Sequence, residues 1–418
     1  MKWRTPGRVA ATALVGLVVP SAAAAAGIAG ATGAIYTDRD HGAPPAPVTP
    51  AAAPGHDPGK PTAVVVLGLE GANVADVLAP YEVLAGTEAF NVYTAAAQRQ
   101  PVPLTGGLDL IPDLTFGELD DRLPAPPDVI VVPQLAGGAG ANAAPIVGWL
   151  RRQRAEGDPL LMSVCVGAEV LASAGVLDGR PATSHWLGLI GLRRDYPAVR
   201  WTDGVAYVDD GDVITTAGVL SGVDGALRVV ERMLGPAAAE RAARAVDWPA
   251  YSPGGAAPIQ RSRPAPADVV AVLSAGYRWD RPTTGVLLTD GVGEIELASA
   301  FRPYTELSYL ARPVALTADG RSLPEQVAPV YLHDRPGFAF DAALGDIART
   351  RDVATTRWVA KSLQYPTALP RLSGPAWPWD LTLRPVLIAT AAVVAAVGIQ
   401  LTIRRSSTGG NHATAYRP

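Results

Sequence analysis

The chain has 418 residues, of which 48% are hydrophobic and only 18% charged, so it is long enough for two domains and is not a wholly disordered protein. Its 35 basic and 39 acidic residues give a net charge of -4, which disfavours direct binding of nucleic acid, because such binding needs a basic excess. The single cysteine, Cys165, excludes an intrachain disulfide, and no Cys/His spacing indicates a zinc site.

The N-terminal stretch is apolar and follows basic residues. Residues 9–36 carry no charge, and Lys2, Arg4 and Arg8 precede them. This order is typical of a membrane anchor and also of a signal peptide that is removed. Small residues within the stretch offer cleavage sites. Residues 1–36 are therefore interpreted as either an anchor or a signal peptide, and the two alternatives stay open.

A second apolar stretch lies near the C-terminus. Residues 385–403 are uncharged, about the number needed to cross a bilayer, and Arg404 and Arg405 follow them. This pattern predicts a transmembrane helix. The positive-inside rule places these arginines and Arg8 in the cytoplasm. We therefore expect a cell-membrane protein with one or two transmembrane helices, its soluble domains outside the cytoplasm and a cytoplasmic tail at residues 404–418.

A proline-rich stretch leads into an alternation of strands and helices. Residues 37–61 hold seven prolines, which predict an extended linker because proline fixes φ and removes a hydrogen-bond donor. Short apolar runs then alternate with amphipathic segments, which predicts an α/β domain with a mostly parallel sheet over residues 62–246. The strands are expected at 63–68, 90–95, 128–133, 160–164, 205–208 and 213–216, and the helices at 74–85, 144–156, 167–174, 187–194 and 221–234.

The following part of the chain resembles the beginning of this domain. Residues 247–266 have linker composition, and the later run GVLLTDGVGEIELASAFRPY resembles the earlier VVVLGLEGANVADVLAPYEV. The alignment places Glu296 opposite Asp76. We interpret residues 267–370 as a partial, degenerate second copy, catalytically inert because it lacks a cysteine turn. Residues 341–363 are expected to form helices packed on the surface, with a helix-turn-helix as the alternative.

Cys165 stands where an apolar strand passes into a helix. In the run PLLMSVCVGAEVLASAG, the cysteine ends the strand and Gly167 follows two residues later. This is the pattern of a nucleophile elbow, in which a strained turn presents the side chain and the helix N-terminus stabilises a thiolate. The alternative is a small buried side chain, the commonest role of a lone cysteine.

Three blocks give the sequence a recognisable resemblance: DVLAPYEVL, SVCVGAEVLASAGVLDGRPATSHW and VITTAGVLSGVDGALRVVERMLG. Over residues 62–236 the chain resembles the DJ-1/PfpI family, part of the class I glutamine amidotransferase-like superfamily. Within it the chain is most similar to isonitrile hydratase and to the amidotransferase-like ligand domain of AraC-type regulators. The resemblance implies a flavodoxin-like α/β sandwich with its elbow at Cys165. It also leaves a homodimer open, because many relatives dimerise.

The resemblance assigns roles to three residues. Cys165 matches the nucleophilic or redox-active cysteine, Asp76 the acid whose carboxyl contacts the sulfur, and His185 the histidine near it. Asp76 would then act as an acid–base group, and His185 would hold or relay a proton. The alternatives are an acid favoured by a helix N-terminus for Asp76 and a satisfied polar residue beside Trp186 for His185.

The substrate-binding part of the pattern matches less closely. Gly137 and Gly138 lie in the loop where family members offer backbone N–H groups to an oxyanion, but this loop is longer than usual. Val166 stands where isonitrile hydratase has a threonine, and it cannot form a side-chain hydrogen bond. This departure weakens the hydratase interpretation. The peptidase motif Cys-His-Gly also fails at Val166, so a protease is rejected.

Three interpretations remain. The first, placed slightly ahead, is a cysteine-dependent hydratase, hydrolase or glyoxalase-like enzyme acting on a small molecule. The second is a domain that binds a metabolite without turnover. The third is a thiol redox sensor, which would need an external thiol because the chain has no second cysteine. The expected partners are a membrane and a small molecule, without nucleic acid, and neither a metal nor an organic cofactor is implied.

Overall fold

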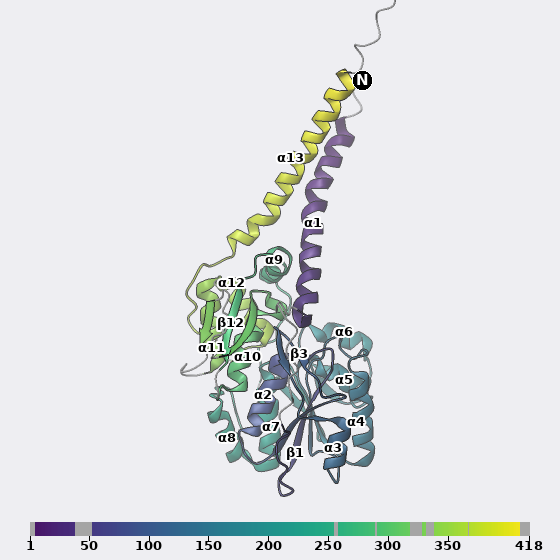
Figure 1. Cartoon of the computed structure of the whole chain (residues 1–418), viewed down its shortest axis with the longest axis vertical. Helices are drawn as coiled ribbons and strands as arrows, with labels where there is room; N and C mark the ends of the chain where they lie inside the picture. Colours follow the sequence, from purple (N-terminus) through teal and green to yellow (C-terminus); the bar gives the residue numbers. More distant parts are fainter. Residues whose placement is uncertain are drawn as a thin grey trace, which may run out of the picture.

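The computed structural model shows two long helices projecting from an α/β body (Figure 1). The structure describes residues 5–37, 52–254, 258–288, 291–317, 328–331, 338–366 and 368–409; most of the predicted linker at 37–61 lies outside them. The projecting helices are α1 (Thr5–Thr37) and α13 (Trp379–Gly409), which pack side by side. Their segments Val9–Tyr36 and Trp379–Ile403 are long and apolar enough to cross a membrane.

A seven-stranded sheet forms the centre of the body. Its order is β10-β11-β7-β6-β1-β2-β5, and every neighbouring pair is parallel except β10 with β11. The central strands are apolar runs without exposed positions, as expected for a parallel sheet that helices cover on both faces. The strands are β1 (Thr62–Leu67), β2 (Asn91–Ala96), β5 (Leu114–Thr115), β6 (Val129–Val132), β7 (Leu160–Ser163), β10 (Tyr207–Asp209) and β11 (Val213–Thr216).

The helices around this sheet agree closely with the predicted ones. The helices α2, α4 and α7 begin and end at the predicted residues, and α5 and α6 differ by one residue at each end. Two pairs of three-residue strands, β3 with β4 and β8 with β9, were not predicted, and neither were β5, α3 and α8. The elements are α2 (Val74–Ala85), β3 (Val102–Leu104), β4 (Leu108–Leu110), α3 (Phe116–Arg122), α4 (Ala144–Glu156), α5 (Ala168–Ser173), β8 (Pro181–Thr183), α6 (Gly188–Asp195), β9 (Arg200–Thr202), α7 (Ser221–Leu234) and α8 (Pro236–Ala245).

One predicted strand begins later than expected. The strand expected at 205–208 is observed as Tyr207–Asp209, because Val205 forms a separate bridge with Pro258. The antiparallel pairing of this strand with β11 agrees with the predicted hairpin. The order of the five main parallel strands, β2-β1-β6-β7-β11, is that of a flavodoxin-like sheet.

A second group of elements, here called the second unit, runs from α9 to α12. Its parallel sheet has the order β13-β12-β14, and the succession β12–α10–β13 has the same connections as β1–α2–β2. Asp76 and Glu296 each occupy the third position of their helix, whereas the aligned Asp290 lies outside the described residues. The elements are α9 (Val269–Tyr277), β12 (Thr283–Leu288), α10 (Glu294–Phe301), β13 (Arg312–Thr317), β14 (Ala328–Tyr331), α11 (Ala339–Thr350) and α12 (Val353–Leu363).

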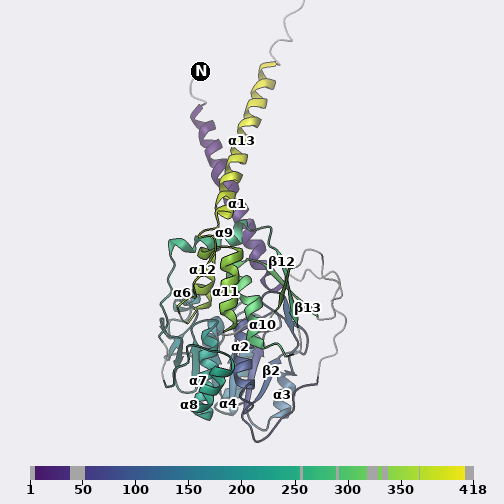
Figure 2. The same cartoon turned by 90° about the vertical axis from the view of Figure 1, so that its left-hand side faces the viewer.

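The second unit packs directly on the first. Helices α2 and α10 lie against each other, as Figures 1 and 2 show. At their contact the Glu82 carboxylate accepts the backbone N–H of Ile295 at 2.6 Å. Buried side chains of α10, α11 and α12, among them Phe301, Phe340 and Val359, belong to the same hydrophobic core as the central sheet. The predicted helices at 341–363 are therefore partly buried in the interface.

Candidate functional site around Cys165

Cys165 lies on a sharp turn directly after β7. Its φ of 55° is in the left-handed region, which non-glycine residues rarely adopt, and a short 3-10 turn leads from it into α5. The Ser184 hydroxyl donates to the Cys165 carbonyl at 2.8 Å and fixes the turn. A side chain at Gly167 would collide with the backbone of Val132, so this position requires glycine. The predicted nucleophile elbow is confirmed.

The thiol itself is enclosed. Cys165 is only 2% exposed, and its Sγ donates a hydrogen bond to Oε1 of Gln134 at 3.3 Å. Burial raises the pKa of the thiol well above its usual value, and the nearby carboxyls of Asp76 and Glu306 raise it further, whereas Arg302 opposes them. In this arrangement the sulfur is a neutral thiol, and a neutral thiol is a poor nucleophile.

Asp76 lies in the same enclosed space, at the third position of α2. Its Oδ2 accepts the backbone N–H of Gln134 at 3.1 Å, and its Oδ1 has no hydrogen-bond partner among the described residues. Burial raises the pKa of the Asp76 carboxyl well above its usual value, and Glu306 raises it further. Asp76 and Cys165 therefore meet through Gln134, whose backbone N–H binds the carboxyl and whose side chain binds the thiol.

Gln134 is a residue that the sequence reasoning missed. It follows β6, and besides its bonds to Asp76 and Cys165 its Nε2 donates to Oε1 of Glu306 at 3.2 Å. A single residue thus joins the elbow, the acid and the second unit, through its backbone N–H and its side-chain amide. Its position just beyond the C-terminal end of a parallel strand was the available signal, since sites collect at that edge.

The second unit contributes a buried ion pair to the site. Arg302 Nε lies 2.9 Å from Oε2 of Glu306, and the two side chains are 2% and 6% exposed. The same Oε2 accepts a hydrogen bond from Nδ2 of Asn73 at 2.8 Å. The sequence reasoning missed both residues. Their spacing of four within the largely apolar run FRPYTELSYL was a signal of a paired, buried charge.

His185 faces the second unit. Its Nε2 lies 2.8 Å from the carbonyl oxygen of Ser362, and its ring packs against Trp186. Burial lowers the pKa of His185 to about 4, and Arg302 lowers it further against the opposing effect of the Ser362 carbonyl, so the imidazole is neutral. Within the described part of the chain, no hydrogen bond joins His185 to the Cys165 thiol.

Within the described residues, no hydrogen bond joins the predicted oxyanion loop to the Cys165 thiol. Gly137 and Gly138 have φ values of 73° and 61°, so both need the freedom of glycine. The Gly138 N–H donates to the carbonyl of Leu135 at 3.2 Å and is therefore already occupied. Val166 is partly buried and packs toward Gly188. The polar group that contacts the Cys165 thiol is the Gln134 side chain and not a backbone N–H of this loop.

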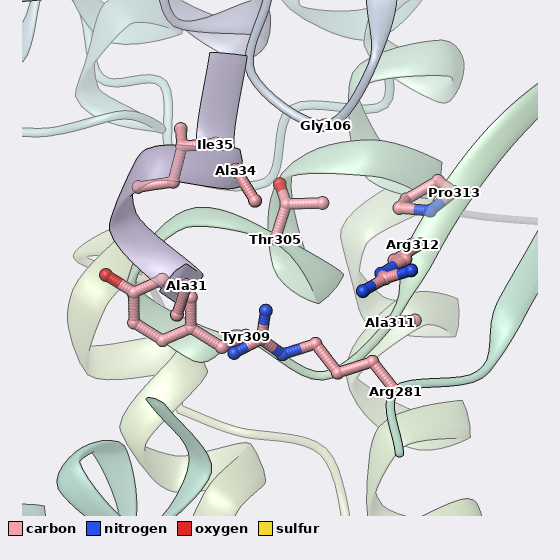
Figure 3. A pocket seen from close by; sticks show the side chains of 10 residues that line it. All are labelled: Ala31, Ala34, Ile35, Gly106, Arg281, Thr305, Tyr309, Ala311, Arg312 and Pro313. Atoms are coloured by element: carbon pink, nitrogen blue, oxygen red, sulfur yellow. The ribbon is translucent and has the colours of Figure 1, made fainter. Parts of the chain in front are cut away.

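A small cavity separates the end of α1 from the second unit (Figure 3). Its volume of about 30 Å³ has room for a water molecule or two. Thr305 and Tyr309 face the helix end across it, and Arg281 lies over the Tyr309 ring at 5.5 Å. The described residues contain no group of three or more His, Cys, Asp or Glu side chains that could hold a metal ion.

The fold and the elbow define a flavodoxin-like domain built around a cysteine. The model of the DJ-1/PfpI family matches residues 62–232. Isonitrile hydratase of Pseudomonas putida is 34% identical over 164 residues, which are 38% of this chain and 67% of that protein. The chain belongs to the DJ-1/PfpI family.

Two solved bacterial structures are similar to part of this chain. The crystal structure of a THiJ/PfpI family protein from Pseudomonas syringae covers 49% of this chain and 85% of its own, with 28% identity and a TM-score of 0.40. That of an AraC family transcriptional regulator from Pseudomonas putida covers 44% and 98%, with 21% identity and a TM-score of 0.38.

Proposed function

We propose that this chain is a membrane-anchored sensor, in which a DJ-1/PfpI domain responds to a small molecule and the second unit passes the response to the membrane helices. One observation carries the proposal. The second unit inserts the Arg302–Glu306 ion pair into the Cys165 site and bonds it to Asn73 and Gln134. A site filled by another part of the same chain is suited to switching rather than to continuous turnover.

The protonation states favour binding over redox sensing. Oxidation of a cysteine begins from an accessible thiolate, whereas burial and two neighbouring carboxyls keep Cys165 protonated. The Oδ1 of the buried Asp76 carboxyl lacks a partner among the described residues and can accept a hydrogen bond. Once the second unit withdraws, Asp76 would offer this oxygen to a ligand.

The length of α1 supports a membrane anchor that also reaches the site. Thirty-three residues of helix extend about 50 Å, whereas hydrocarbon is about 30 Å thick. The exposed large apolar side chains of α1 lie between Val9 and Val19, and Ala31 is buried. We propose that the first part of α1 spans the bilayer and that the remainder belongs to the soluble body.

Helix α9 marks the level of the membrane surface in this proposal. It is seen end-on in Figure 1 and crosswise in Figure 2, so it lies across the axes of α1 and α13. Its Val269 and Val272 are exposed, as is the neighbouring Trp279, which suits an interfacial position. The Tyr277 hydroxyl donates to the Pro20 carbonyl at 3.0 Å, and this contact holds α9 against α1.

The inner end of α1 lies beside the residues that begin α2. The Ile35 carbonyl accepts the N–H of Gly106 at 3.2 Å, and the Tyr36 ring lies against Gly71, two residues before Asn73. These contacts favour an anchor that is retained over a signal peptide that is removed. They also give a direct path from the membrane helix to the Cys165 site.

The orientation can be tested with introduced cysteines. The outer ends of α1 and α13 both point away from the body on the same side of it (Figures 1 and 2), in agreement with basic residues at one membrane face. In a Cys165→Ser background, a membrane-impermeant maleimide applied to whole cells should label a Glu240→Cys variant and leave a Ser407→Cys variant unlabelled. The reverse labelling would contradict a soluble body outside the cytoplasm.

The sensor proposal requires the site and the membrane helices to be coupled. Gln400 Nε2 donates to Thr12 Oγ1 at 3.2 Å, so cysteines at these positions in a Cys165→Ser background report helix proximity. Glu306→Ala should change the rate of their oxidative crosslinking at least severalfold, whereas Glu240→Ala on exposed α8 should not. Equal rates in both variants would contradict the proposed sensor.

A cysteine-dependent enzyme is the second candidate. The strained elbow at Cys165 and the 34% identity to isonitrile hydratase support it. This candidate predicts that the full chain hydrates isonitriles, or converts α-dicarbonyls, and loses the activity on Cys165→Ala. The sensor predicts no Cys165-dependent turnover by the wild-type chain. Turnover by the Glu306→Ala variant alone would indicate a gated enzyme.

A further inference from the structure

A larger pocket lies on the other side of α12. Its volume is about 490 Å³, which suits a small metabolite, and it opens between the connecting segment 259–265 and the C-terminal half of α12. Tyr365 and Leu369 give it an apolar wall. Its charged lining is entirely basic: Arg261, Arg263, Arg357 and Lys361.

Only part of this positive charge is neutralised. Arg261 pairs with Asp203 at 3.0 Å, and Lys361 pairs with Asp268 at 2.6 Å. Arg263 and Arg357 have no carboxylate partner in the described part of the chain, and both are exposed at the pocket. An anion would therefore meet two uncompensated guanidinium groups, which suit carboxylate and phosphate oxygens.

Gln364 forms part of the pocket wall where α12 ends. It lines the pocket, yet it is only 8% exposed, and its Oε1 has no hydrogen-bond partner among the described residues. Its φ of 52° puts a non-glycine residue in the left-handed region, at a cost of about 1–2 kcal/mol. The left-handed conformation ends α12 as its C-cap, and the Oε1 is enclosed against Gly218, so this oxygen is not open to the pocket.

We propose that this pocket binds a small organic anion, a carboxylate or a phosphate ester. The guanidinium groups of Arg263 and Arg357 hold the anionic end, and the rest of the ligand lies against Tyr365 and Leu369. The proposal rests on the sensor function, because it identifies the pocket as the place where the signal enters.

Consecutive residues of α12 connect this pocket to the Cys165 site. Lys361 and Gln364 line the pocket, and between them the Ser362 carbonyl contacts His185. The Leu363 carbonyl accepts the N–H of Leu220 at 3.4 Å. A ligand that draws Lys361 toward itself therefore displaces the segment that covers the Cys165 site.

The test uses the full chain in nanodiscs of zwitterionic lipid and measures binding by calorimetry. The probes are malate and glycerol 3-phosphate, with glycerol as the uncharged comparison. We expect saturable binding of at least one anion and none of glycerol. Arg263→Ala and Arg357→Ala should each weaken binding about tenfold, and Arg244→Ala on exposed α8 should leave it unchanged. Failure of both anions to bind, or wild-type affinity in both pocket variants, would overturn the proposal.

The same binding measurement in nanodiscs that contain phosphatidylglycerol tests whether the anion in the pocket is a lipid headgroup. Loss of malate and glycerol 3-phosphate binding there would assign the pocket to lipid headgroups and contradict a soluble ligand.

A separate readout distinguishes the pocket from the sensor. Saturating anion should change the rate at which Cys165 is alkylated at least severalfold. Anion binding without a change in the alkylation rate of Cys165 would support the anion site and contradict the sensor function. A different result is that the Glu306→Ala variant changes the alkylation rate of Cys165 while the wild-type chain binds no anion. This result would support closure of the site by the second unit and contradict the anion pocket.

Discussion

Glu306 accepts a hydrogen bond from Nδ2 of Asn73 at 2.8 Å, although 233 positions separate the two residues. Asn73 is also the N-cap of α2, where its Oδ1 accepts the N–H of Ala75 at 3.1 Å. In the opposite direction, Glu82 of α2 accepts the N–H of Ile295 at the start of α10. Each unit thus provides a carboxylate that accepts a hydrogen bond at the start of a helix in the other unit. These contacts join the two units around the cysteine.

The first prediction concerns the buried ion pair. Arg302→Met leaves Glu306 buried without its cation and should lower the free energy of unfolding by about 3–5 kcal/mol. The double variant Arg302→Met/Glu306→Leu removes both charges and should recover most of this loss. Chemical denaturation of the full chain in detergent measures both. A double variant as unstable as Arg302→Met would show that the pair is not coupled as the structure indicates.

The second prediction concerns His185 and pH. Its pKa is about 4 in the folded chain and about 6.5 when unfolded, so its contribution to stability is present above pH 6.5 and is lost as the pH falls toward 4. The shift corresponds to about 3 kcal/mol in total. The difference in unfolding free energy between wild type and His185→Gln should therefore shrink as the pH falls from 6.5 toward 4. Parallel pH profiles would contradict a buried neutral imidazole.

The third prediction concerns the contact between α1 and α9. A Cβ added at Gly27 would overlap the backbone of Gly276, whereas at Gly30 it would meet nothing within 4 Å. Gly27→Ala should therefore lower the thermal midpoint of the full chain. Gly30→Ala should raise the thermal midpoint slightly, because alanine favours a helix over glycine by up to about 1 kcal/mol. Equal effects of the two substitutions would argue against docking of α9 on α1.

Local signals explain which parts of the fold could be predicted. The three helices with correctly predicted bounds are each bordered by a local signal, namely Asn73 before α2, Gly157 after α4 and Gly235 after α7. The Cys165 elbow follows from a strand, a cysteine and a glycine in one short run. Three-residue strands such as β8 carry too few positions to show an alternation.

The closure of the site could not be read from the sequence in the same way. Glu306 and Ser362 approach Gln134 and His185 from more than 170 positions away, through packing that leaves no local pattern. The resemblance assigned Cys165, Asp76 and His185 to one site, and in the structure the first two contact Gln134 while His185 contacts Ser362. It could not show that the second unit occupies the space between them, since the family match ends at residue 232.

Alkylation of Cys165 in the full chain tests most directly whether the second unit closes the site. The rate in detergent at pH 7.5 is compared with that of glutathione under the same conditions and with those of the Glu306→Ala and Glu240→Ala variants. We predict that wild type and Glu240→Ala react at least a hundredfold more slowly than glutathione, because alkylation must wait for opening. Glu306→Ala should react at least tenfold faster than wild type. A wild-type rate equal to that of glutathione, and unaffected by Glu306→Ala, would contradict the closed site.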